Sequence, residues 1–210
     1  MGAIFQSLSR TIIAGVVLLA VFIVIAGLGT KEWIRIGEHA WWAFFFRWLH
    51  VLSGVMWIGL LWYFNVVQIP ALAAAAADKG GPGGAGISKY IAPRALRWFR
   101  WSAVATWLTG IWYLLRAGNL IGAFSLGMGG EEFNAYQFVI GVGAWLGTIM
   151  LFNVWALIWP NQKKILGMVA ASDAEKATAR TIALLASRTN TALSIPMLAC
   201  MAGQSHGLPF

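Results

Sequence analysis

The sequence predicts an all-α integral membrane protein, a single domain over residues 1–210 built as a bundle of about five transmembrane helices. Hydrophobic residues make up 60% of the chain and charged residues only 10%, which leaves too few polar side chains to cover a soluble globule. Five segments are apolar enough to cross a hydrocarbon core about 30 Å thick, which takes roughly 20 helical residues. Most basic residues fall between these segments, as in a multi-pass membrane protein.

The predicted spans lie near 11–30, 41–69, 97–116, 137–159 and 189–205. The first has an apolar run from Ile12 to Leu28, longer than the 7–15 residues or so of a signal-peptide core, and no small-residue cleavage site follows it. We therefore expect it to be retained as a membrane anchor. The segment 173–187 mixes charges with an apolar stripe, and we expect it to lie along the membrane surface before the last span.

The distribution of charge predicts the orientation of the chain. The net charge is +8, and 11 of the 15 lysines and arginines lie near the N-terminus or in 70–100 and 160–188. Five spans place these regions on one side, so the positive-inside rule predicts a cytoplasmic N-terminus and a periplasmic C-terminus in a bacterial inner membrane. The lipid bilayer explains the basic residues, and nucleic-acid binding is not expected.

The second predicted span contains ionisable side chains, Arg47 and His50, in an aromatic-rich helix. Such residues are costly within a bilayer and indicate function. Helical spacing of three and four residues puts Arg47, Gly54 and Trp57 on the face of His50. This face suits a b-type haem, with imidazole as axial ligand, glycine as space for the ring, arginine for a propionate and tryptophan as packing.

The second axial ligand is not settled by the sequence. His39 lies eleven residues before His50, about 16 Å along one helix, so it cannot bind the other face of the same iron. His206 lies near the outer end of the last span and is, like His39, a weaker metal-ligand candidate. Thioether ligands are also possible, from Met56, Met150, Met197 or Met201. The alternative is structural: His50 bonds to a neighbouring helix, Arg47 reaches the headgroups and Gly54 permits close packing.

Two further polar or small-residue patterns stand in the last two spans. The start of the last span, 187–191, is rich in polar residues, and Arg188 with Asn190 is either a polar contact within the bundle or a site for an anionic ligand. Gly143 and Gly147 form a G-x-x-x-G pair that predicts helix packing. Cys200 is the sole cysteine, which excludes an intrachain disulfide and a covalently attached c-type haem.

The order Phe46-Arg47-Trp48-Leu49-His50-Val51, followed by Trp57-Ile58-Gly59 and Tyr63-Phe64, resembles the membrane domain of PuuD-type urate oxidases. Those enzymes oxidise urate and pass electrons to cytochrome c. The resemblance implies a redox role for His50, with Arg47 and Trp57 beside it. No C-x-x-C-H motif occurs in the sequence, so we expect the cytochrome c domain to be lacking and the partner to be a separate cytochrome c or a larger membrane complex.

Two functions of different classes follow from these patterns. The first is a redox or electron-transfer membrane subunit carrying haem b, a possible oxidoreductase subunit. The second is a non-catalytic accessory subunit of a larger respiratory or photosynthetic complex. The redox function requires His50 to face a cavity of porphyrin size. The accessory function predicts a packed, hydrogen-bonded His50 and exposed apolar patches that match other subunits.

Overall fold

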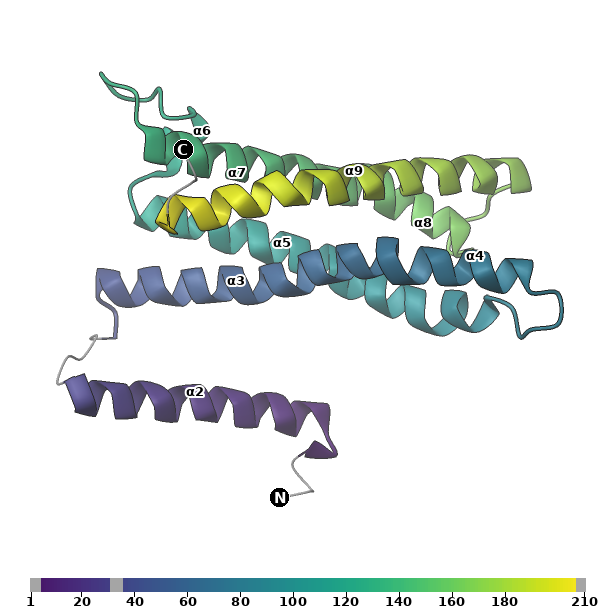
Figure 1. Ribbon diagram of the computed structural model, residues 1–210, viewed down its shortest axis with the longest axis horizontal. Coiled ribbons are helices and arrows are strands. Elements are labelled where there is room, and N and C mark those ends of the chain that lie inside the picture. Colours follow the sequence, from purple (N-terminus) through teal and green to yellow (C-terminus); the bar gives the residue numbers. More distant parts are fainter. Residues whose placement is uncertain (1–4, 31–35, 207–210) are drawn as a thin grey trace. The chain divides into compact units, whose positions relative to one another are not determined.

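The structure, a computed structural model, describes residues 5–30 and 36–206, with side chains through residue 203. No strand occurs among these residues, which are almost entirely helical (Figure 1). The chain divides into two compact units, Met1–Trp41 and Trp42–Phe210. The absence of strands among the described residues confirms the predicted all-α class. The single predicted domain corresponds to two units of unequal size.

The first unit consists mainly of α2, Leu8–Thr30, a helix of 23 residues. Its apolar side chains are largely exposed, for example Ile12 at 58%, Phe22 at 66% and Leu28 at 66%. No charged residue occurs from Thr11 to Thr30. A helix that is apolar on all faces and long enough to cross a bilayer is suited to lipid rather than water, as predicted for 11–30.

The second unit is built from long helices that follow one another in antiparallel order. The first is α3 (His39–Tyr63), whose first turn contains the unit boundary, continued by η1 (Phe64–Gln68) and α4 (Ile69–Ala77). Next come η2 (Ile87–Ile91), α5 (Ala92–Arg116) and the short α6 (Leu120–Phe124). The last are α7 (Ala135–Phe152), η3 (Asn153–Ile158), α8 (Trp159–Ile165) and α9 (Asp173–His206).

These helices lie side by side as an up-and-down bundle (Figure 1). The loop 78–86 joins α4 to η2 at one end, and α6 with its flanking loops joins α5 to α7 at the other. α9 packs along α7, η3 and α8. Each long helix therefore runs the length of the bundle, and residues from all of them meet at each end.

A π-helical segment precedes a proline in three places: η1 before Pro70, η2 before Pro93 and η3 before Pro160. Proline has no backbone N–H, and its ring clashes with the carbonyl of the preceding turn. Widening that turn to π geometry lets the helix continue past the ring. Prolines that mark helix ends in a soluble protein therefore lie inside continuous helices here.

The core lies midway along the bundle. Its largest fully buried side chains include Trp57 and Leu61 of α3, Phe99 of α5 and Met150 of α7, with exposures of 0–2%. The rings of Phe64 and Phe99 meet edge to face, with centroids 5.4 Å apart. This geometry stabilises aromatic pairs beyond their buried area and links the first two long helices.

Three stretches of the described residues are long and apolar enough to cross a membrane: Leu8–Thr30, His39–Ala77 and Ala135–Ile165. They contain the first, second and fourth predicted spans. The third and fifth predicted spans lie within α5 and α9, which are not among these three stretches. A membrane crossing by α5 and α9 stays a prediction, and so does the orientation of the chain.

The expectation that 173–187 forms a separate surface segment was wrong. α9 is one helix of 34 residues that begins at Asp173 and includes Pro196. Ala179, Ala183 and Ala186 are buried, with exposures of 1%, 3% and 6%, because α8 packs against this part of α9. The apolar stripe of the segment therefore faces protein.

Candidate cofactor site

A cavity of about 550 Å³ lies between α3, α5, α7 and α9 of the second unit. This volume is within the range of roughly 300–1,000 Å³ that small-molecule sites occupy. All four residues predicted for the haem site line it, namely Arg47, His50, Gly54 and Trp57. We call it the histidine cavity. Its wall is mostly apolar, with polar groups contributed by few residues.

His50 is held by the backbone of α5. Its Nδ1 lies 2.8 Å from the carbonyl oxygen of Thr106, and since a carbonyl only accepts, Nδ1 carries the proton. In a neutral imidazole the lone pair is then on Nε2, which is the arrangement of histidines that bind metals. A hydrogen-bonded His50 and a His50 that lines a cavity were predicted as alternatives, and the structure has both features.

Gly110 allows this contact between the two helices. A Cβ at position 110 would lie 2.9 Å from both Cε1 and Nδ1 of His50, closer than side chains approach one another. Thr106 and Gly110 were not identified from the sequence. Nothing in their local pattern distinguishes them, because their role depends on which helix packs against His50.

Arg47 lies on the wall of the cavity and is exposed. Its guanidinium carbon is 5.1 Å from the centroid of the Tyr113 ring, a cation–π contact. No carboxylate of the described residues forms an ion pair with it. Arg47 therefore has donors for an anionic group of a ligand, such as a carboxylate.

The two other predicted residues have different surroundings. A Cβ at Gly54 would meet Thr106 Cγ2 at 3.7 Å, an ordinary contact. The space beside this glycine is therefore no larger than a methyl group needs. Trp57 is 2% exposed, and its Nε1 has no hydrogen-bond partner in the described part of the protein. More space is left by Gly59 and Gly147, which line the cavity and where a Cβ would meet nothing within 4 Å.

The other candidate metal ligands are separated by the fold. His39, the first residue of α3, is exposed, and the side chain of His206 lies outside the described residues. Met150 is fully buried in the core and Met56 is 43% exposed. Met197 and Met201 of α9 line the histidine cavity. No group of three or more His, Cys, Asp or Glu side chains that could hold a metal ion occurs in the part of the chain that the structure describes.

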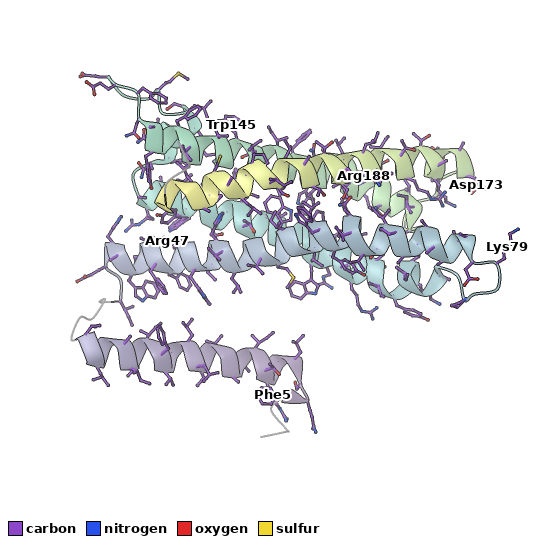
Figure 2. The ribbon with its side chains drawn as sticks, in the orientation of Figure 1. Phe5, Arg47, Lys79, Trp145, Asp173 and Arg188 are labelled. Atoms are coloured by element: carbon purple, nitrogen blue, oxygen red, sulfur yellow. The ribbon has the colours of Figure 1, made fainter. Side chains whose placement is uncertain are left out.

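The proposed pair of Arg188 and Asn190 is not brought together. Arg188 is exposed on α9, whereas Asn190 is completely buried (Figure 2 labels Arg188). Asn190 Oδ1 accepts from Asn153 Nδ2 at 2.8 Å, and its Nδ2 donates to the Met150 carbonyl at 2.9 Å. Asn190 thus joins α9 to α7 and η3, and an anionic ligand at Arg188 stays a prediction.

A second cavity of about 630 Å³ lies toward the other end of the bundle, between η1, α4, α5, α8 and α9. Its polar wall residues include Gln68, Gln162, Arg180 and Ser187, and none of the described residues on its wall is a histidine, cysteine or methionine. It therefore has no side chain that commonly binds haem iron through nitrogen or sulfur. Of these two cavities, the histidine cavity is the one whose described wall has a histidine and methionines.

Comparison with known proteins bears on the part of this cavity wall that α6, α7 and α9 form. Residues 123–210 match the family described as urate oxidase N-terminal. The urate-oxidase resemblance predicted from the sequence is confirmed by this match. The urate-oxidase-type segment contains Gly143, Gly147, Met197 and Met201 of the cavity wall, whereas His50 and the residues that suggested the resemblance lie before it. No curated protein and no solved structure matched the chain.

Proposed function

We propose that this urate-oxidase-like membrane protein binds a b-type haem in the histidine cavity and acts as an electron-transfer subunit of a bacterial inner membrane. A separate cytochrome c or a larger membrane complex would be its redox partner. The observation that carries the proposal is the hydrogen bond from His50 Nδ1 to the Thr106 carbonyl at 2.8 Å, which leaves Nε2 as a metal ligand in an apolar cavity of about 550 Å³.

The surrounding residues fit such a group. His50 would supply a nitrogen ligand to the iron, and the Thr106 carbonyl would keep the proton on Nδ1 and the ring oriented. Gly59 and Gly147 leave open space at the wall, which suits a flat ring. Arg47, which has no acidic partner among the described residues, would pair with a propionate. When bound, the haem would supply one-electron oxidation and reduction, at a potential set by its ligands and by burial.

The test is a reduced-minus-oxidised visible spectrum of the full chain, purified after expression with haem supplied. We expect a b-type difference band in the wild type and in His39→Ala, and its loss in His50→Ala. His39→Ala is the matched control, because it removes the exposed histidine of the same helix. Size-exclusion chromatography and circular dichroism show whether each variant is folded.

A folded, haem-supplied wild type without a band would contradict the proposal. An accessory role would then be the working alternative, with the exposed apolar side chains of the helices as contact area for other subunits. A band that persists in His50→Ala would instead show that haem binds elsewhere. Urate turnover by the chain with an added cytochrome c tests the coupling to urate oxidation separately.

A further inference from the structure

The side chain of Arg100, on the first half of α5, lies on the indole ring of Trp159 and near that of Trp155. Its guanidinium carbon is 3.5 Å from the centroid of Trp159 and 6.0 Å from that of Trp155. At 3.5 Å the two planar groups are in van der Waals contact, and an arginine in this position gains both stacking and cation–π attraction. The guanidinium is therefore held in one place by α8 and η3.

The hydrogen-bonding groups of this guanidinium are not used by the protein. Arg100 Nε and Nη1 are both buried and have no hydrogen-bond partner in the described part of the chain. No carboxylate of those residues forms an ion pair with Arg100. A buried donor on a charged group is costly when it has no partner. Both atoms are covered by protein, so an external anion would act on the uncompensated positive charge of the guanidinium rather than accept from these two donors.

The charges around Arg100 are positive. Arg97 lies one helical turn earlier and acts on Arg100 electrostatically. Lys163 of α8 places its Nζ 5.9 Å from the centroid of the Trp159 ring. Three cations and two tryptophans, Arg97, Arg100, Lys163, Trp155 and Trp159, form what we call the Arg100 cluster. The positive charge of this cluster favours an anionic ligand.

We propose that the Arg100 cluster binds the phosphate group of an anionic phospholipid. Tryptophans concentrate at the level of the headgroups, and basic pockets between membrane helices recognise anionic headgroups. Apolar aromatic surface for an acyl chain adjoins the cluster: Trp101 is 53% exposed and meets Trp155 edge to face with centroids 5.4 Å apart. This surface favours a lipid over a free phosphate ion.

The test measures lipid binding to the delipidated full chain by native mass spectrometry, in mixed micelles with phosphatidylglycerol or phosphatidylcholine. The wild type is expected to bind phosphatidylglycerol more tightly. Arg100→Gln is expected to weaken phosphatidylglycerol binding about fivefold, the loss of one cation near an anionic surface, and to leave phosphatidylcholine binding unchanged. If Arg100→Gln does not fold, Lys163→Gln is measured instead and is expected to weaken binding in the same direction.

Arg94→Gln is the matched control. It removes one cation from the same end of α5, where Arg94 is exposed and its Nη1 donates to the Tyr90 carbonyl at 2.6 Å. The proposal is overturned if Arg94→Gln weakens binding as much as Arg100→Gln, or if the wild type shows no preference for phosphatidylglycerol. Displacement of that lipid by inorganic phosphate at the same concentration would show that the cluster binds a free anion, and it would overturn the proposal of a lipid ligand.

Discussion

At the scale of single residues, the environment of His50 is set by atoms on another helix. The Thr106 carbonyl accepts from Nδ1, and Gly110 leaves the space that the imidazole occupies. His50 could be identified from the sequence because an ionisable group in a membrane helix is costly. Its partners were not predictable, because one α5 residue among many becomes the acceptor only when the two helices pack in a particular register.

We predict that Gly110→Ala removes haem binding without unfolding the protein. The new Cβ would lie 2.9 Å from Cε1 and Nδ1 of His50, so the imidazole must move and lose its bond to Thr106. A lost hydrogen bond costs about 1 kcal/mol, and alanine recovers about as much in helix propensity. Thermal unfolding in detergent and haem content per chain are the two measurements.

The matched control for this variant is Gly15→Ala in α2, where a Cβ would meet nothing within 4 Å. It should keep the wild-type haem content. Full haem content in Gly110→Ala would show that the contact with Thr106 does not orient the ligand.

At the scale of elements, the start of α9 is defined by a capping box. Ser172 Oγ lies 3.3 Å from the Glu175 amide nitrogen, and Glu175 Oε2 accepts from the Ser172 amide at 2.7 Å and from its hydroxyl at 2.9 Å. The S-x-x-E pattern is a known sequence signal for a helix start. Because this cap initiates the helix at Asp173, the charged segment and the last predicted span form one element rather than two.

The cap makes the first turn of α9 sensitive to acid. Hydrogen bonds from the backbone N–H and then the hydroxyl of Ser172 lower the pKa of Glu175 from its ordinary value of 4.5. A carboxylate with a lowered folded-state pKa stabilises the fold above pH 4.5, and this stabilisation is lost as the pH falls through the lower value. We expect amide-exchange protection at 172–176, corrected for intrinsic rates, to stay constant above that pH and to decrease below it.

Glu175→Gln should remove this pH dependence, because the side chain no longer titrates. Glu131→Gln, which removes a carboxylate from an exposed position in the loop before α7, is expected to retain it. An unchanged pH profile in Glu175→Gln would show that another group controls the first turn.

At the scale of the whole molecule, the arrangement of the helices says more about how many of them cross the membrane than the composition of each helix does. α5 is not among the three stretches that are apolar enough to cross a membrane, and it contains Arg94, Arg97, Arg100 and Arg116. These arginines occupy its two ends, and 101–115 contains no charge. α5 also joins the far end of α4 to the start of α7, and it lies beside both (Figure 1). If its neighbours cross the membrane, α5 crosses it with them.

We therefore expect the loop 78–86 and the loop between α6 and α7 to lie on opposite sides of the membrane. Reporter fusions at Gly83, Gly129 and the C-terminus measure this: the positive-inside rule places the first in the cytoplasm and the other two in the periplasm. Fusions at Gly83 and Gly129 that report the same side would contradict a crossing by α5. A cytoplasmic C-terminus would reverse or shorten the predicted passage of α9.

The sequence by itself determined the all-helical class, the apolar character of α2, α3 and α7, and the selection of His50 and Arg47 as candidate site residues. These follow from local properties, namely hydropathy over about 20 residues and the cost of burying charge. Only the tertiary structure decided that Thr106 and Gly110 meet His50, that Met197 and Met201 rather than Met56 or Met150 reach its cavity, and that Asn190 is a helix contact apart from Arg188. Helix pairing and register arise from packing between residues distant in the chain, so no local pattern specifies them.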